Sequence, residues 1–338
     1  MSTTPDRLAV GVIGCGRMGR LHARVCSQMP QVRLAGVYDL DDEAARQTAQ
    51  QYGTRAADSL EQLLAQVRAA VIAVPTQMHL AVAQQCLQRG IACLIEKPLA
   101  ATAIDAARLV ELATAAKVVV QAGHIERFNP AVRALQKLNL RPRFIEVVRI
   151  SPLTFRSLDV GVVLDMMIHD LDIVLHLAGS TVTSIDAAGA SVVSPTEDVC
   201  SARLKFANGC SANLTASRLA MKTERRLRLF AQEAFASIDY QHRQGAVIRR
   251  SGNLDTLREV VQRVRLGQVT DFSQLSYKDL VKIEPLAIDE REPAREQLES
   301  FVEAVIRGGR PAVSAVEGLA AVELAQRIVD AMGEDVRV

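Results

Sequence analysis

The stretch LAVGVIGCGRMG, residues 8–19, runs from a short apolar segment straight into a GxGxxG loop. A helix-like segment follows to about Met29, and a second apolar run, residues 32–38, ends on Asp39. This acid comes twenty positions after Gly19. A dinucleotide site needs a strand, a glycine loop, a helix, a second strand and an acid in this order. The stretch therefore predicts the first βαβ unit of a Rossmann fold.

Each residue of the loop has a separate task in this interpretation. Gly14 allows the tight turn after the strand, Gly16 lets the backbone approach a pyrophosphate, and Gly19 lets the helix lie against the sheet. Arg17 and Met18 complete the predicted cofactor-binding loop. The helix that begins here offers unpaired N–H groups and a partial positive charge to phosphate.

Asp39 indicates which dinucleotide is bound. Its carboxylate would accept hydrogen bonds from a ribose diol and repel a 2′-phosphate, and the next residues, Leu40, Asp41 and Asp42, add no positive charge. NAD is therefore favoured over NADP. The alternatives are a βαβ unit without a ligand and a methyltransferase, which also places an acid after its second strand.

The composition excludes several classes of protein. The 338 residues, 49% hydrophobic and 23% charged with a net charge of +2, are typical of a globular protein and show no footprint for nucleic acid or an anionic membrane. There is no apolar signal core and no apolar run of about 18 residues. The six cysteines form no CxxC pair, which favours buried thiols in a cytoplasmic protein. The histidines lack HxH or HExxH spacing, so we expect no metal site.

The alternation of strands and helices predicts two domains of different construction. Up to residue 123 it indicates six strands in a doubly wound parallel sheet, the Rossmann domain. Residues 124–338 then predict an α+β domain for substrate binding and oligomerisation, built on a large, mostly antiparallel open sheet. Asn208-Gly209 predicts a hairpin within it. Because an open sheet face commonly needs a partner, we expect a homodimer or homotetramer.

Three polar segments are candidates for chemistry. Lys97 follows the apolar run 91–95, at the carboxyl end of a predicted parallel strand, where open α/β sheets bind ligands; alone it would be read as a solvated lysine. Asp165 and His169 are four residues apart on an apolar helix predicted over residues 162–177 and should share a face. The alternative is a core histidine with a carboxylate partner. Asp172, three residues after His169, could be that partner as well as Asp165.

The third segment, GHIERFNP at residues 123–130, lies where the predicted Rossmann domain ends. Loops at such a junction face the interdomain cleft. His124 and Arg127 are therefore candidates for substrate contact, with bracing of the junction as the alternative.

Together these segments resemble the glucose–fructose oxidoreductase, inositol dehydrogenase and rhizopine-catabolism family (Gfo/Idh/MocA) over nearly the whole chain. The resemblance implies catalytic roles for Lys97, Asp165 and His169 in an NAD-dependent dehydrogenase. Met167 departs from the glycine that the family often has there, which puts the substrate in doubt. The segments implied to line the nicotinamide half of the cofactor contain Val74, Pro75, Thr76, His79, Glu96 and Lys97.

GHIERFNPAV and LDMMIHDLD resemble a subgroup, the UDP-N-acetylglucosamine 3-dehydrogenases, whose keto product leads to a diamino sugar of lipid A. A nucleotide sugar needs cations for its diphosphate, and the basic residues 218, 222, 225, 226 and 228 fit loosely; a solvated strand edge is the alternative. The residues expected to bind substrate are Lys97, His124, Arg127, Asn129, Arg156, Asp165, His169 and Arg218.

The sequence thus predicts oxidation of a secondary sugar hydroxyl, with hydride passing to NAD. His169 would be the general base, Asp165 would orient the imidazole, and Lys97 would stabilise the alkoxide or share the proton. One alternative is an inositol or free-sugar dehydrogenase. Another is a non-catalytic NAD-sensing regulator, although such proteins tend to lose the lysine–histidine pair.

Overall fold

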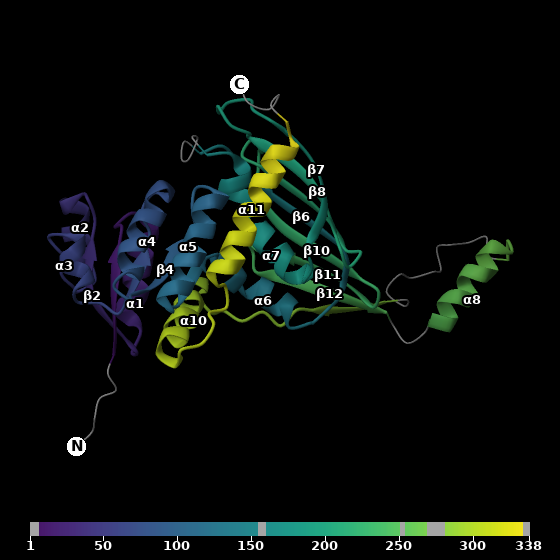
Figure 1. Ribbon diagram of the computed structural model, residues 1–338. Helices are drawn as coiled ribbons and strands as arrows, with labels where there is room; N and C mark the ends of the chain where they lie inside the picture. Colours follow the sequence, from purple (N-terminus) through teal and green to yellow (C-terminus); the bar gives the residue numbers. More distant parts are fainter. Residues whose placement is uncertain (1–6, 155–159, 251–253, 269–280, 334–338) are drawn as a thin grey trace, which may run out of the picture.

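The computed structural model describes residues 7–154, 160–250, 254–268 and 281–333. The chain forms two sheets that lie side by side, and helix α11 (Ala315–Ala331) runs between them and packs on helices of both sides (Figure 1). All six cysteines are buried and free, as the sequence predicts. None of the described helices combines the length and apolar character needed to cross a bilayer.

The N-terminal sheet has five strands, all parallel, in the order β2-β1-β3-β4-β5. The prediction of six strands is wrong, since the sheet has five strands in the described residues; the chain between the second and third strands forms two helices and the isolated bridge Val37–Ala56. The strands are mostly buried, as expected when helices cover both faces, and Arg33 in the second strand is exposed. They are β1 (Leu8–Ile13), β2 (Val32–Tyr38), β3 (Ala69–Ile72), β4 (Ala92–Glu96) and β5 (Val120–Gly123).

Helices connect these strands, and their starts follow ordinary capping chemistry. The side chain of Asp41 accepts hydrogen bonds from the backbone N–H groups of Glu43 and Ala44 at the start of α2, and Thr102 caps α5 in the same way. The connecting helices are α1 (Arg17–Gln28), α2 (Asp42–Gln51), α3 (Leu60–Leu64), η1 (Thr76–Met78), α4 (His79–Leu87) and α5 (Ala103–Ala116).

The strand order places a ligand-binding crevice at the turns after β1 and β3. Strand β1 lies between β2, which follows it, and β3, so the direction of winding reverses there. Open α/β sheets bind ligands at the carboxyl ends of strands at such a switch point. The glycine loop follows β1, and the segment from Ala73 to Thr76 follows β3.

The second sheet has eight strands in the order β13-β12-β11-β10-β6-β9-β8-β7. Every neighbouring pair is antiparallel except β6 and β9. Asn208-Gly209 joins β8 and β9 as predicted, with Gly209 at φ +83°. The strands are β6 (Pro142–Ile150), β7 (Val182–Ala190), β8 (Val199–Phe206), β9 (Ser211–Ser217), β10 (Glu224–Ala231), β11 (Ala234–Asp239), β12 (Gln244–Arg250) and β13 (Val281–Pro285).

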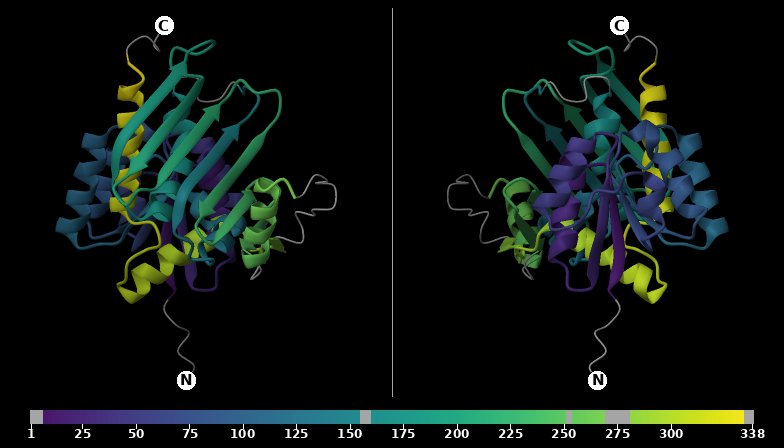
Figure 2. Two further views of the ribbon diagram at one scale, coloured as in Figure 1. Left: turned by 90° about the vertical axis from the view of Figure 1, so that its right-hand side faces the viewer. Right: turned by 90° about the vertical axis from the view of Figure 1, so that its left-hand side faces the viewer.

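Helices cover one face of this sheet, and its other face is open in the left panel of Figure 2. The covered face holds a core in which α7 and α11 pack on the inward residues of β6, β8, β9 and β10. Helix α10 packs against α1, so the C-terminal helices reach back to the first sheet. The remaining helices are η2 (Ile125–Phe128), α6 (Pro130–Gln136), η3 (Val163–Met167), α7 (Ile168–Ala178), α8 (Leu254–Arg265) and α10 (Pro293–Arg307).

The segment predicted as one regular helix over residues 162–177 has two parts. Residues Val163–Met167 form a π-helical turn, η3, and α7 continues from Ile168. A π-turn has i→i+5 hydrogen bonds, so residues before and after it lose the regular α-helical register. Asp165 lies within this turn and His169 lies beyond it.

Candidate active site

The glycine loop has the geometry that a dinucleotide requires. A Cβ on Gly14, whose φ is +94°, would stand 2.4 Å from the carbonyl oxygen of Ala73, and a Cβ on Gly19 would stand 1.7 Å from that of Gly14. These two glycines hold the turn and the helix against the sheet. Gly16 instead faces open space, with no atom within 4 Å of a Cβ placed there.

Helix α1 begins at this loop without a capping side chain. Its N-cap is Gly16, so no side chain accepts a hydrogen bond from the first N–H groups. Arg17 is exposed and Met18 half-buried at this helix start. Open space at Gly16 and uncapped N–H groups fit the pyrophosphate of NAD.

Asp39 lies half-buried at the end of β2, facing the same loop. One carboxylate oxygen accepts a hydrogen bond from the backbone N–H of Cys15, and the other accepts one from the N–H of Asp41 at 2.9 Å. These bonds hold the acid beside the glycine loop, where the ribose of a bound dinucleotide would lie.

His79 ties the turn after β3 to the turn after β4. The ring is buried, with Nδ1 2.9 Å from the carbonyl oxygen of Pro98 and Nε2 3.0 Å from that of Val74. Burial lowers the pKa of His79 below its ordinary value, although both carbonyls act in the opposite direction. Pro75 and Thr76 lie between these anchors, exposed and half-buried respectively.

Glu96 supports the backbone of Lys97. Its carboxylate lies 2.7 Å from Nε2 of His22 on α1 and also accepts a hydrogen bond from the N–H of Lys97 at 3.3 Å. Gly123 packs directly on the backbone of Glu96, since a Cβ on Gly123 would stand 2.7 Å from Cα of Glu96. The sequence pattern did not single out His22, although its position on the inner face of an amphipathic helix indicates burial.

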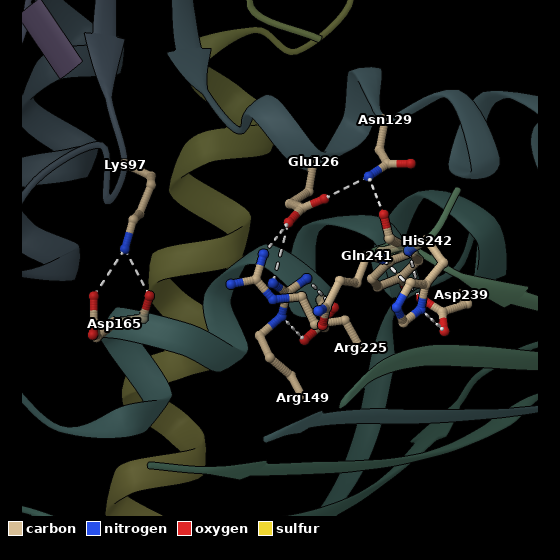
Figure 3. A network of polar contacts seen from close by, with 11 residues as sticks. Lys97, Glu126, Asn129, Arg149, Asp165, Arg225, Asp239, Gln241 and His242 are labelled. Atoms are coloured by element: carbon tan, nitrogen blue, oxygen red, sulfur yellow. Dashed lines mark hydrogen bonds and ion pairs between the residues drawn. The ribbon is translucent and has the colours of Figure 1, made fainter. Parts of the chain in front are cut away.

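Lys97 and Asp165 are brought into direct contact across the two sheets (Figure 3). The Lys97 ammonium donates to the backbone carbonyl of Asp165 at 2.6 Å and to its carboxylate at 3.1 Å. Both residues line a cavity of about 560 Å³ together with Thr76, Gln77 and Glu197. His124 and His169 are not among the residues that line it.

His169 is close to this pair but is not held by Asp165. The Asp165 carboxylate bonds Lys97 instead, which corrects the expectation that it orients the imidazole; the π-turn removes the two residues from simple i,i+4 register. Nδ1 of His169 is buried and has no hydrogen-bond partner among the described residues. Burial, and then the charges of Lys97 and Arg149, hold the pKa of His169 well below its ordinary value.

Asp172 is not the partner of His169 either. Its carboxylate accepts hydrogen bonds from Arg127 at 2.9 and 2.6 Å, and both side chains are almost fully buried. The bidentate pair joins η2 to α7. This geometry favours the bracing alternative for Arg127 over substrate contact.

Asn129 and His124 are also turned into the junction. Asn129 caps α6 by accepting a hydrogen bond from the N–H of Ala131 at 3.0 Å, while its amide donates to Glu126 and to the carbonyl of Tyr240. His124 is fully buried, and neither ring nitrogen has a hydrogen-bond partner among the described residues. Burial lowers the pKa of His124.

The two arginines expected at the substrate have different outcomes. Arg218 is buried, 3.7 Å from the carboxylate of Asp198, and donates to Ser194 and to the carbonyl of Val160. Its contacts therefore lie within the fold. Arg156 lies outside the described residues.

A buried charge network that the sequence did not predict lies next to His169. Arg149 on β6 donates to the carboxylate of Asp170 at 2.7 and 2.9 Å and to Glu126 at 3.2 Å, and it stacks over the Tyr240 ring at 5.5 Å. Burial would lower the pKa of Arg149, but the charges of Asp170 and Glu126 raise it. Arg225 on β10 also reaches Glu126, at 3.6 Å (Figure 3).

No group of three or more His, Cys, Asp or Glu side chains is arranged as metal ligands in the described part of the chain. The arrangement as a whole offers a phosphate-binding turn, an acid for a ribose, a cation paired with a carboxylate, and a neutral imidazole. These are the groups that hydride transfer from a secondary alcohol requires.

Comparison with known proteins agrees with this geometry. Residues 8–124 match the oxidoreductase family GFO/IDH/MocA with an NAD-binding Rossmann fold, and residues 149–237 match the GFO/IDH/MocA C-terminal domain. The UDP-N-acetylglucosamine 3-dehydrogenase of Acidithiobacillus ferrooxidans is 40% identical over 69% of this chain and 74% of its own. A crystal structure of that organism's enzyme, GnnA, has a TM-score of 0.86 at 32% identity and covers 96% of this chain and 97% of its own. The inositol 2-dehydrogenase of Rhizobium meliloti is 26% identical over 96% of both chains.

Proposed function

The chain belongs to the GFO/IDH/MocA oxidoreductase family with its NAD-binding Rossmann fold, and we propose that it oxidises the 3-hydroxyl of UDP-N-acetylglucosamine to the 3-keto sugar. The contact of Lys97 with Asp165, next to His169, carries the proposal for the chemistry. The 40% identity to a UDP-N-acetylglucosamine 3-dehydrogenase supports the substrate.

The residues of this chain divide the proton chemistry among them. Lys97 donates a hydrogen bond to the reacting oxygen and stabilises the alkoxide charge that develops on it. Asp165 holds the ammonium in place through its carboxylate and its backbone carbonyl. His169 takes the hydroxyl proton, because its lowered pKa keeps the ring neutral at neutral pH. When bound, NAD supplies the hydride acceptor.

Binding of the cofactor falls to the crevice between β1 and β3. The loop from Gly14 to Gly19 and the start of α1 would hold the pyrophosphate, and Asp39 would accept hydrogen bonds from the ribose hydroxyls. The turns after β3 and β4 line the nicotinamide half, held together by His79 and Glu96. With the nicotinamide in this position, the reacting carbon of the substrate would lie beside Lys97.

An inositol or free-sugar dehydrogenase is the second candidate. The observation that favours it is the match to an inositol 2-dehydrogenase over 96% of the chain. Such an activity would use the same lysine, aspartate and histidine but would need no site for a diphosphate.

A substrate panel decides between these candidates. NADH absorbance would be followed with UDP-N-acetylglucosamine, UDP-glucose, N-acetylglucosamine and inositol at equal concentrations, and the product carbon would be identified by NMR. We expect turnover with UDP-N-acetylglucosamine and a ketone at carbon 3. Preferential oxidation of inositol would establish the second candidate, and NAD binding without oxidation of any alcohol would favour a regulatory protein.

We also propose that the chain acts in the cytoplasm as a homodimer or homotetramer. Its two domains would span residues 1–123 and 124–338. Its product would lead to a diamino sugar of lipid A. The open face of the second sheet supports self-association. Phe144, Phe230 and Phe235 form a stacked row on neighbouring strands, with ring centroids 5.6 and 4.7 Å apart, and Phe230 is 37% exposed. Light scattering would give the mass in solution.

A further inference from the structure

Strand β10 presents its arginines to two different surfaces. Leu227 and Leu229 are buried in the core under α7, so Arg225, at the same parity, lies on that helix-covered face. Arg226 has the opposite parity and belongs to the open face of the sheet. The pairing of Arg225 with Arg149 on β6 agrees, since Arg149 contacts Asp170 of α7.

The two inward arginines are satisfied to very different degrees. Arg149 is buried, with two bonds to Asp170 and one to Glu126. The side chain of Arg225 is 44% exposed although it lies on the covered face. Within the described residues its guanidinium makes no hydrogen bond, and its ion pair is with a Glu126 oxygen 3.6 Å away that Arg149 already uses. Its planar fork of N–H donors is therefore available to a ligand.

The contacts of Arg225 place this fork next to the charge network of Glu126, Arg149 and Asp170. Burial, then Arg149, lower the pKa of Arg225, and the charge of Arg17 from the glycine loop acts in the same direction. The charge of Arg225 in turn contributes to the lowered pKa of His169. Through Glu126 and Arg149, this fork is joined to Asp170, the residue that follows His169. Figure 3 shows Arg225 beside Glu126 and Arg149.

We propose that Arg225 is a specificity-determining residue that binds the diphosphate of a nucleotide-sugar substrate while the sugar lies beside His169. This inference rests on the proposed function and names the residue that separates a nucleotide sugar from a free polyol. A guanidinium with unused donors matches two adjacent phosphate groups, which it can bind in a bidentate manner.

A diphosphate bound at Arg225 could belong to the substrate or to the cofactor, and the structure favours the substrate. The cofactor pyrophosphate has the uncapped start of α1 and the open space at Gly16. Arg225 comes from the second sheet, in the charge network that begins one residue from His169 at Asp170. Arg218, the arginine that the sequence suggested for this task, is bound inside the fold.

The test compares Arg225→Gln with Arg226→Gln, which removes the same charge one residue along the strand from the opposite face. For Arg225→Gln, KM for UDP-N-acetylglucosamine and Kd for UDP on the NADH-loaded protein should rise about 10- to 100-fold, the worth of a charged hydrogen bond. The Kd for NADH should stay within about twofold. Arg226→Gln should change none of these values, and Arg225→Lys should recover part of the UDP affinity because it restores charge without the fork.

Each further outcome decides the inference. An unchanged UDP affinity in Arg225→Gln overturns it, and so does a loss of NADH affinity as large as the loss of UDP affinity, which would assign Arg225 to the cofactor. If the variant is destabilised, as thermal melting would show, Arg225→Lys carries the same comparison. If the unaltered protein oxidises no UDP-sugar, the proposed function fails, while calorimetry with UDP still decides the role of Arg225.

Discussion

At the scale of single residues, the chemistry depends on how the environment sets each charge. Lys97 has two acceptors from Asp165, so its ammonium is fixed in position before a substrate arrives. His169 is kept neutral by burial and by nearby cations, which suits a base and disfavours a second positive charge at the same place. The carboxylate thus acts on the lysine, and the imidazole is left free to take a proton.

This division predicts the kinetics of two variants. Lys97→Ala and His169→Ala should each lose at least about 100-fold in turnover, the usual worth of a general base or an alkoxide-stabilising group. Both should still bind NADH, measured by fluorescence titration, because neither belongs to the glycine loop. Near-normal turnover in either variant would refute the assignment.

His169 also sets the pH dependence of kcat/KM. A histidine base works only when neutral, and the pKa of His169 lies below its ordinary value, so kcat/KM should remain high as the pH falls through about 6.5. The acid limb of the profile should appear below that pH. A limb at or above 6.5 that disappears in His169→Ala would contradict the lowered pKa.

At the scale of elements, short contacts between segments decide where the catalytic groups stand. The π-turn η3 carries Asp165 toward Lys97, while the Arg127–Asp172 pair fixes α7 to η2. A buried pair of this kind is weak evidence of net stabilisation, but the loss of one partner leaves an unpaired buried charge. The junction is therefore sensitive to single substitutions.

Arg127→Met tests this point. We expect a loss of about 3–5 kcal/mol in the free energy of unfolding, because Asp172 would remain buried without its partner. The control is Arg108→Met, which removes an exposed i,i+3 pair with Glu111 and should cost less than about 1 kcal/mol. Urea unfolding measures both, and equal losses would argue against the bracing role.

The glycine turn offers a second comparison between neighbouring positions. Gly19→Ala should disrupt packing of α1, because its Cβ would meet the carbonyl of Gly14. Gly16→Ala has room and an ordinary φ of −69°, so it should fold normally and lose NAD affinity, since the new methyl group would occupy the space of the pyrophosphate. Thermal melting and NADH titration separate the two effects. Unchanged NADH binding in Gly16→Ala would show that the pyrophosphate does not lie against Gly16.

At the scale of the whole molecule, buried neutral histidines make stability depend on pH. His79, His124 and His169 all have pKa values lowered by burial. Below about pH 6.5 the unfolded chain binds protons at these positions and the folded chain does not, so stability should be fully present above that pH and be lost as the pH falls. Urea unfolding at pH 7.5 and 5.5 measures the loss. His124→Phe should reduce the difference between the two values, and an unchanged difference would mean that His124 titrates normally when folded.

The local sequence determined those parts of the protein that depend on neighbours along the chain. The glycine loop, Asp39, the buried parallel strands and the Asn208-Gly209 hairpin follow from turn geometry and hydrophobic periodicity, and the resemblance to the family rests on the motifs around Gly14, Lys97 and His169. The count of six parallel strands was wrong, because only five apolar runs alternate with helices before residue 123 and each of them forms one strand of the sheet.

Tertiary structure decided the pairing of charges, since each partner comes from a distant element. Asp165 bonds Lys97, Asp172 bonds Arg127, and Asp170 bonds Arg149, although helical spacing had assigned the first two to His169. The exposure of an arginine on a β-strand depends on what covers each face, so Arg218 is enclosed while the Arg225 side chain is 44% exposed. Short-range physics specifies the elements, and only their packing brings charges tens of residues apart within hydrogen-bond distance.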